Sequence, residues 1–151
     1  MLPSRGKSCP VPNETDRVRR IFDKQAPKYD RTMALFERLL FGGMRQWACS
    51  RARGDVLEIA VGTARNLACY PEGTTLTGIE LSPEMAALGR RRAQEVGREI
   101  DIRVGDAERL EFPDESFDTV VCTFGLCTIP DHRGGPRGQA RAAPGRSVRA
   151  R

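Results

Sequence analysis

Hydrophobic and polar positions follow a helical rhythm over the first third of the chain. From Asn13 to about Gly42, apolar residues recur three and four positions apart, as on one face of an amphipathic helix. They form one set before Pro27 and a second set after it: Val18, Ile21 and Phe22, and then Met33, Leu35, Phe36, Leu39, Leu40 and Phe41. Gly42 and Gly43 interrupt this pattern, and residues 44–51 predict a further short helix.

From Gly54 onward, short apolar runs replace the helical rhythm. Four of them predict β-strands, at residues 55–60, 75–80, 100–104 and 117–123. Strands that alternate with helical segments are typical of βαβ units. The chain is therefore predicted to be an α/β protein with a parallel sheet and helices on both faces, in which strands one to four form an incomplete sheet.

Two helices are expected between these strands. A short one follows the first strand and ends before Pro71. Ser82-Pro83 opens a longer one, because serine is a good N-cap and proline fits the first helical turn, and Gly97 ends it. Its apolar face is expected to hold Met85, Leu88 and Val96, whereas the triplet at residues 90–92, all arginine, is expected to be a solvated face.

Composition places few constraints on this picture. Hydrophobic residues make up 39% and charged residues 30% of the 151, as in ordinary globular proteins. No run approaches the roughly 18 apolar residues that span a membrane, and the first 13 residues resemble a disordered lead-in without a secretory signal. A cytoplasmic protein without an integral membrane segment is the resulting expectation.

The cysteines and the charge argue against a metal site and a nucleic-acid partner. Five cysteines without a CxxC pair and a single histidine, His132, make a zinc site or disulfide framework unfavourable. The net charge of +5 comes from the end of the chain, where six arginines and no acid follow residue 132. Without those arginines, 19 basic residues face 20 acidic ones, so residues 1–132 have no basic surplus for binding nucleic acid.

Candidate binding residues gather where the predicted strands end. Small residues at positions 60, 62 and 64 follow strand one and allow a tight turn close to a ligand. Glu80 ends strand two, where a carboxylate can accept hydrogen bonds from both ribose hydroxyls. Asp106-Ala107 follows strand three, where the carboxylate can accept from an exocyclic amine. Right-handed crossovers would bring the ends of strands one, two and four to one crevice.

Four segments in order resemble the class I S-adenosylmethionine-dependent methyltransferases, particularly the branch similar to ubiquinone and menaquinone biosynthesis enzymes. They are the helices with Phe22 and P-x-Y-D, the loop E-x-A-x-G-T, the joint G-I-E-L-S-P-E-M, and G-D-A-x-x-L-x-F-P-D-x-S-F-D. The resemblance runs from about Val18 to His132 and implies a Rossmann-like fold that binds S-adenosylmethionine.

The resemblance also implies roles for ten residues. Those expected to hold the methionine portion are Glu58, Ala60, Gly62 and Thr63, with Thr123 near its end. Those expected around the adenosine are Glu80 at the ribose, Leu81 and Met85 against the adenine, and Asp106 and Ala107 at its amine and edge. Two family glycines are alanines here, at positions 60 and 64, and alanine tolerates a positive φ poorly.

No catalytic residue is assigned, because the cofactor itself supplies the reactive methyl group. Asp131 and His132 are interpreted as a loop pair, and Tyr29 as either a closing residue or a helix-packing one. The expected acceptor is small or lipid-like, either a quinone-precursor ring carbon or a phospholipid amine. The alternatives are an inactive remnant that binds the cofactor weakly or not at all, and a nicotinamide-dependent oxidoreductase. The oxidoreductase alternative is weakened because the G-x-G-x-x-G fingerprint of nicotinamide-binding folds is missing, since position 65 is arginine.

The domain boundaries follow from these patterns. They are a disordered lead-in at 1–13, a helical cap at 14–53, a partial cofactor-binding core at 54–132 and a disordered tail at 133–151. The tail is rich in Arg, Gly, Ala and Pro, and valine is its only sizeable apolar residue. One back-translation of the tail, read one base later, encodes the helix and Leu-x-Pro-Gly-Gly turn that the family has here. The tail is therefore interpreted as out of frame.

Overall fold

The computed structural model describes residues 14–40, 43–125, 140–141 and 147–148. A four-stranded parallel sheet lies at its centre, with the strand order β3-β2-β1-β4. The strands are β1 (Asp55–Ile59), β2 (Thr75–Glu80), β3 (Asp101–Val104) and β4 (Thr119–Cys122). The α/β fold with a parallel sheet, predicted from the sequence, is confirmed, and the change of direction in the strand order falls between β1 and β4.

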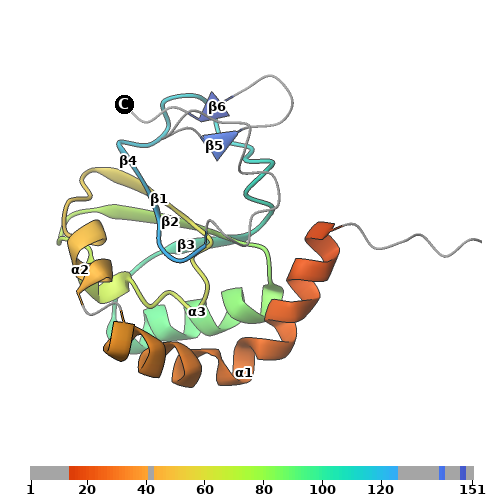
Figure 1. Ribbon diagram of the computed structural model, residues 1–151. Helices are drawn as coiled ribbons and strands as arrows, with labels where there is room; N and C mark the ends of the chain where they lie inside the picture. Colours follow the sequence, from red (N-terminus) through yellow and green to blue (C-terminus); the bar gives the residue numbers. More distant parts are fainter. Residues whose placement is uncertain (1–13, 41–42, 126–139, 142–146, 149–151) are drawn as a thin grey trace, which may run out of the picture.

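The α-helices of the described residues lie on one side of the sheet (Figure 1), whereas the sequence predicted helices on both faces. They are α1 (Glu14–Leu40), α2 (Met44–Cys49) and α3 (Pro83–Val96). The apolar sets on both sides of Pro27 belong to a single helix as far as Leu40, and this helix continues through the exposed proline. Phe41 lies outside the described residues. Helix α3 packs directly against the sheet, and α1 packs across α3 (Figure 1).

Helix α3 begins and ends as its sequence predicts, but its buried face is different. Ser82 caps its N-terminus by accepting a 3.1 Å hydrogen bond from the Met85 amide, and Gly97 ends it in the left-handed conformation. The prediction that Val96 lies on the buried face is wrong, because Val96 is 53% exposed. Met85 is buried as predicted, and the small residues that allow the close approach to the sheet are Ala86, Gly89 and Ala93.

The arginine triplet on α3 is largely solvated, as predicted, because Arg90 and Arg91 are exposed and Arg92 is half-buried. It nevertheless contacts neighbouring elements: Arg90 donates a 2.6 Å hydrogen bond to the carbonyl of Ile102, and Arg92 pairs with Asp30 of α1. Arg91 lies in an exposed pair with Glu95 one turn away. The helical pattern marked these positions as polar, but it carried no information about the strand and the helix that pack beside them.

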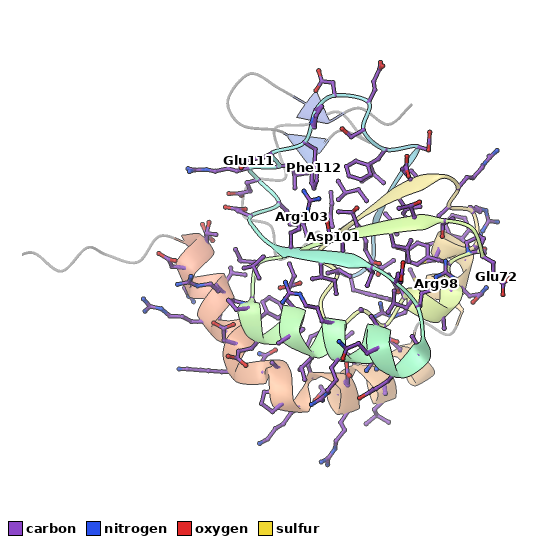
Figure 2. The ribbon with its side chains drawn as sticks, turned by 180° about the vertical axis from the view of Figure 1, so that it is seen from behind. Glu72, Arg98, Asp101, Arg103, Glu111 and Phe112 are labelled. Carbon is purple, nitrogen blue, oxygen red and sulfur yellow. The ribbon has the colours of Figure 1, made fainter. Side chains whose placement is uncertain are left out.

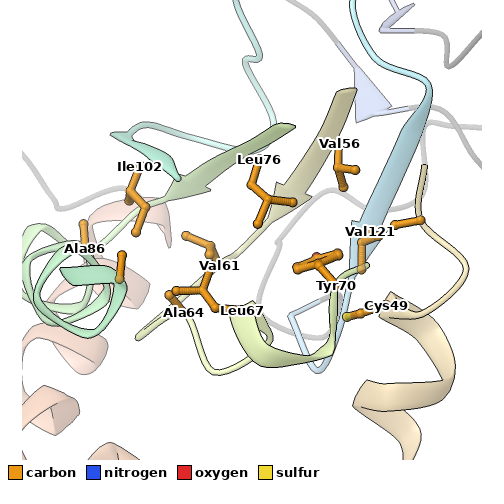
Figure 3. Packing of buried hydrophobic residues seen from close by; sticks show 12 residues of the cluster. Cys49, Val56, Val61, Ala64, Leu67, Tyr70, Leu76, Ala86, Ile102 and Val121 are labelled. Atoms are coloured by element: carbon orange, nitrogen blue, oxygen red, sulfur yellow. The ribbon is translucent and has the colours of Figure 1, made fainter. Parts of the chain in front are cut away.

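Two apolar clusters fill the two faces of the sheet, because successive strand side chains point to opposite faces. One cluster lies under α3 and α2 (Figure 3), and its strand members are Val56, Leu76, Ile102 and Val121. The other holds Leu57, Ile59, Ile79, Leu110 and Phe117. The segment between β3 and β4 covers this second face, where the rings of Phe112 and Phe117 meet edge to face at 4.9 Å.

Contacts at the edges of the sheet are mainly polar. Arg98, after α3, donates hydrogen bonds to the carbonyl of Pro71 (2.6 Å) and to Thr74 (2.9 Å) in the turn before β2. Figure 2 shows Arg98 beside Glu72 at this end of the sheet. On β3, Arg103 pairs with Asp101 at 2.8 Å and stacks over Phe112. These contacts fix the loops on either side of the strands.

Three features differ from the sequence prediction or lie outside the described residues. The segment between β1 and β2 forms only a 3₁₀ turn, η1 (Leu67–Cys69), which packs against α2, where a short helix was predicted. The predicted disorder of residues 133–151 is wrong at four residues, where β5 (Ala140–Arg141) pairs with β6 (Ser147–Val148). The rest of this tail and the lead-in at 1–13 lie outside the described residues, so their disorder stays a prediction.

Candidate functional site

The loop after β1 has an alternating left-handed backbone. Ala60, Gly62 and Ala64 have φ values of 55°, 58° and 57°. Glycine adopts this conformation freely, whereas alanine does so at a cost. The carbonyl oxygen of Gly62 lies 3.0 Å from the position that a Cβ on Gly89 of α3 would occupy. The loop and α3 therefore approach each other closely. The left-handed turns direct the Gly62 amide toward the end of β2.

Glu80 receives that amide. Its Oε2 accepts a 2.8 Å hydrogen bond from the Gly62 N–H, and its Oε1 accepts one of 2.9 Å from the Ser82 N–H. The side chain is 5% exposed, and burial raises the pKa of the carboxyl group despite the opposing effect of these backbone amides. Each oxygen keeps an acceptor site that a ligand hydroxyl can use.

A single pocket brings together eight of the ten residues that the family resemblance pointed to. The eight are Ala60, Gly62, Glu80, Leu81, Met85, Asp106, Ala107 and Thr123. They come from the ends of all four strands of the parallel sheet and from the first turn of α3. The pocket therefore lies outside the carboxyl ends of the strands, where ligands bind in open α/β sheets.

Helix α1 supplies a wall of the same pocket. Four of its residues line it, namely Thr15, Val18, Phe22 and Tyr29, and the Phe22 and Tyr29 rings meet edge to face at 6.3 Å. The interpretation of Tyr29 as a closing residue was left open in the sequence, and the structure places it in the pocket lining. Burial raises the pKa of its phenol, which therefore stays protonated at neutral pH.

Asp106 and Ala107 begin the segment after β3. The Asp106 side chain accepts a 2.9 Å hydrogen bond from the Glu108 amide through Oδ1, and this bond fixes the direction of the carboxylate. Met85 lines the same pocket beside Gly62 and is 1% exposed. A flat apolar group could therefore rest against Met85 with a polar edge toward Asp106.

Two of the ten residues lie behind the pocket. Glu58 is 3% exposed and accepts hydrogen bonds of 2.7 Å from Asn66 and 2.8 Å from Tyr70. Burial raises the pKa of its carboxyl group to about 7. Thr63 is 1% exposed and donates a 2.5 Å hydrogen bond to Asp30 of α1. Both side chains brace the loop, and their contact with a ligand stays a prediction.

A polar network that the sequence did not reveal connects this bracing layer to the pocket. Asn66 donates a 2.8 Å hydrogen bond to the hydroxyl of Thr123. Arg45 of α2 donates to both, at 2.8 Å to Asn66 and 3.3 Å to Thr123, and its guanidinium also pairs with Glu37 of α1. Arg45 and Thr123 are 78 residues apart, and each is an ordinary polar residue in its own segment. No local pattern could have identified the contacts between these side chains.

The remaining candidates contribute little to the site. Within residues 14–40, 43–125 and the two short strands, no three His, Cys, Asp or Glu side chains are grouped as metal ligands. Cys49 is buried, and burial raises the pKa of its thiol to about 12, while Cys69 and Cys122 are half-buried. Asp131 and His132 lie outside the described residues. No helix in the part of the chain that is described has the length and apolar character to cross a membrane.

Comparison with known proteins supplies the family. A family model described as a methyltransferase domain matches residues 57–141, more than half of the chain. The chain belongs to this family. The resemblance noted in the sequence, to class I S-adenosylmethionine-dependent methyltransferases with a Rossmann-like fold, is therefore confirmed. The match continues beyond His132, where the resemblance was expected to end.

Curated members of the methyltransferase family are similar over much of the chain. A phosphatidylethanolamine N-methyltransferase from Cereibacter sphaeroides is 44% identical over 80 residues, which are 52% of this chain and 39% of that protein. A ubiquinone/menaquinone biosynthesis C-methyltransferase from Geotalea daltonii is 32% identical over 133 residues, 80% of this chain and 55% of its own length. The chain thus spans about half the length of the curated relatives it matches or less.

A solved structure of a methyltransferase gives the same result for the fold. It is a SAM-dependent methyltransferase, possible histamine N-methyltransferase, from Thermotoga maritima, with 30% identity and a TM-score of 0.58. The similarity covers 76% of this chain and 51% of that one. It supports the Rossmann-like interpretation of the four-stranded sheet.

Proposed function

We propose that this chain binds S-adenosylmethionine in the pocket at the strand ends and transfers its methyl group to a small-molecule or lipid-like acceptor. The observation that carries the proposal is the placement of Glu80. A buried carboxylate, fixed by the amides of Gly62 and Ser82, lines the same pocket as Asp106 and Met85. A ribose with two hydroxyls and an adenine with an amine need acceptors of this kind.

The lining residues fit each part of the cofactor. Glu80 would hold the ribose, Asp106 and Ala107 the amine and edge of the adenine, and Leu81 and Met85 its faces. Ala60 and Gly62 would leave room for the methionine portion, because neither residue carries a side chain larger than a methyl group. Thr123, fixed by Asn66 and Arg45, would lie at the far end of that portion.

The bound cofactor would supply an electrophilic methyl group on a sulfonium. The protein then has to align and desolvate the reactants, and it needs a base only if the acceptor must lose a proton. The apolar wall made by Val18 and Phe22 of α1 would exclude water from the pocket. Tyr29, whose phenol stays protonated, could donate a hydrogen bond there. We assign no catalytic residue.

The acceptor is proposed from the relatives. The names of two of them refer to a phospholipid amine and to ubiquinone or menaquinone biosynthesis. Both acceptor types are lipid-like, which favours a phospholipid amine or a quinone-precursor ring carbon for this chain. The apolar side chains of α1 at the pocket are compatible with either.

A dinucleotide cofactor fits the loop after β1 less well. In dinucleotide-binding folds, a long helix after strand one presents its N-terminus to the pyrophosphate. Here η1 is three residues long, and Arg65 occupies the position of the third fingerprint glycine. The Arg65 guanidinium is moreover engaged with Glu37 at 3.1 Å. These features favour S-adenosylmethionine.

Titration calorimetry of the full chain tests the proposal. We expect heat of binding with S-adenosylmethionine and S-adenosylhomocysteine and none with NAD. Methyl transfer would then be measured with labelled cofactor on phosphatidylethanolamine and on a demethylated quinone precursor. Absence of heat with both S-adenosylmethionine and S-adenosylhomocysteine at millimolar concentration would favour the inactive remnant. Binding without methyl transfer would support cofactor binding but contradict the proposed acceptors.

A further inference from the structure

The outer face of α1 carries a row of basic side chains. Arg17, Arg20, Lys24, Lys28 and Arg31 are all exposed. At 3.6 residues per turn, the five fall within an arc of roughly 80° around the helix axis, and every acidic residue of α1 falls outside that arc. Figure 2 shows side chains that end in nitrogen projecting from α1 away from the sheet. We refer to these five residues as the basic row.

The acidic residues of α1 are used on a different flank of the helix. Asp23, Asp30 and Glu37 follow one another at intervals of seven, which places them along one side. Asp23 accepts a 2.5 Å hydrogen bond from Ser82, Asp30 pairs with Arg92, and Glu37 with Arg45. These three carboxylates of α1 are thus engaged with the rest of the fold. Among the ion pairs of the described residues, none involves the basic row.

Apolar side chains are interspersed with the basic row. Ile21 is 42% exposed, and it lines a shallow groove together with Arg17, Arg20 and Lys24. Leu35, on the same face two turns after Lys28, is 63% exposed. Helices that lie on a membrane surface carry lysine and arginine for the headgroups together with apolar side chains that enter the headgroup boundary.

Helix α2 adds an aromatic residue of the kind found at membrane interfaces. Trp47 is 66% exposed and Met44 is 51% exposed. The Arg51 guanidinium lies 4.3 Å from the centre of the Trp47 ring, so the exposed indole is already associated with a cation. Tryptophan is enriched at the level of lipid headgroups, because its ring is apolar and its N–H is polar.

We propose that the basic row of α1 docks this protein on an anionic lipid surface. A group of four to eight basic residues on an amphipathic helix is sufficient for such binding, and the row has five. The exposed Ile21 and Leu35 favour a lipid surface over nucleic acid, since a phosphate backbone offers nothing for aliphatic side chains to enter.

The same helix connects the proposed docking face to the pocket. Val18, Phe22 and Tyr29 line the pocket from the side of α1 that lies opposite the basic row. A docked α1 would hold the pocket about one helix diameter, roughly 10 Å, from the headgroups. A lipid-like acceptor would then have a short path to the site. This last link rests on the proposed function, whereas the docking itself does not.

Vesicle sedimentation of the full chain tests the docking. The partition coefficients would be measured with phosphatidylcholine vesicles and with vesicles of phosphatidylcholine and phosphatidylglycerol in equal parts. We expect binding to the mixed vesicles only, weakened by salt. The double variant R20Q/K24Q should bind about 30-fold more weakly, because each basic residue near such a surface contributes on the order of 1 kcal/mol. Glutamine preserves the helix.

The matched control is R53Q/R91Q, which removes two exposed positive charges outside α1. It should bind like the parent chain, and the arginines at residues 133–151 act equally in both double variants. Equal losses in the two double variants, equal binding to both vesicle types, or tighter binding to duplex DNA at matched phosphate would overturn the proposal. Calorimetry with S-adenosylmethionine on the same variants reports separately on the pocket, so a failure of the proposed function is distinguishable.

Discussion

The Gly62 N–H donates a 2.8 Å hydrogen bond to Glu80 Oε2, across 18 residues of sequence. This bond joins the loop after β1 to the end of β2. It also fixes the orientation of the Glu80 carboxylate, which is buried and lines the pocket and which also accepts a hydrogen bond from the Ser82 amide. The left-handed φ of Gly62 is what turns its amide toward Glu80. The loop conformation and the proposed ribose contact therefore depend on each other.

Substitution of Glu80 should weaken cofactor binding. E80A removes a charged acceptor, so we expect a loss of about 1.5–3 kcal/mol in the binding free energy of S-adenosylhomocysteine. E80Q should lose less, because its amide oxygen can still accept from one hydroxyl. E84A, at an exposed position in the first turn of α3, is the control and should bind normally. Calorimetry measures all three, and normal affinity in a folded E80A protein would remove Glu80 from the site.

Asp106 should determine the preference for an amine on the purine ring. The parent chain is expected to bind adenine-containing ligands more tightly than their inosine analogues, because the carboxylate accepts from an amine but not from an oxo group. D106A should lose most of this preference, and D114A, exposed in the same segment, should retain it. Competition binding with both ligands measures the ratio. If the parent chain binds the two equally, the proposed contact does not exist.

Stability should fall as pH rises through the range in which Glu58 ionises. Burial raises the pKa of this carboxyl from 4.5 to about 7, so the folded protein holds a proton that the unfolded chain releases. The contribution of this proton to the free energy of unfolding is complete below about pH 4.5, and it is lost as the pH rises to about 7. The total loss is on the order of 3 kcal/mol. Urea unfolding between pH 4 and about 8 measures the slope.

The variant E58Q should show a shallower slope over the same pH range. Part of the slope should remain, because burial also raises the pKa of Glu80. The control E111Q changes an exposed carboxylate and should leave the slope as it is in the parent chain. A parent chain whose free energy of unfolding increases from pH 4.5 to 7 would contradict this account of Glu58.

Restoring glycine at position 60 should stabilise the protein slightly. Ala60 has a φ of 55°, which costs an alanine on the order of 1 kcal/mol, and glycine recovers this in exchange for its larger chain entropy. We expect A60G to raise the free energy of unfolding by about 0.5 kcal/mol. In A87G, an exposed position within α3, the same change should lower it by about 0.5–1 kcal/mol. In urea unfolding, A60G and A87G should therefore change the free energy of unfolding in opposite directions.

The sequence predicted the parts of this structure that depend on local patterns. Strand positions, the Ser82 cap and the Gly97 stop all follow from residue types over a few positions. The pocket residues Glu80 and Asp106 were predicted because Glu80 ends one strand and Asp106 lies just after another, and parallel strands end at one edge of a sheet. The positive φ at Ala60 was also expected, since the family has glycine there.

Long-range polar contacts escaped prediction. Asp30 and Glu37 resemble ordinary surface acids of an amphipathic helix, yet they pair with Arg92 and Arg45. A helical pattern shows which side of a helix is polar, but it does not show whether another element faces that side. Val96 illustrates the converse error, because its spacing fits the apolar face although the last turn of α3 leaves it exposed.

The pair between Arg45 and Glu37 should contribute measurably to stability. Their side chains are 16% and 14% exposed, so water screens their attraction weakly, and Arg45 also donates to Thr123 beside the pocket. A double-mutant cycle with R45M and E37Q should give a coupling energy of about 1–3 kcal/mol. The same cycle on Arg91 and Glu95, which are 69% and 65% exposed, should give at most about 0.5 kcal/mol.

R45M should also weaken S-adenosylhomocysteine binding severalfold, since Thr123 loses one of its two donors, whereas R91M should not. Equal coupling energies in the two cycles would show that the network around Arg45 does not hold α1 and α2 to the pocket.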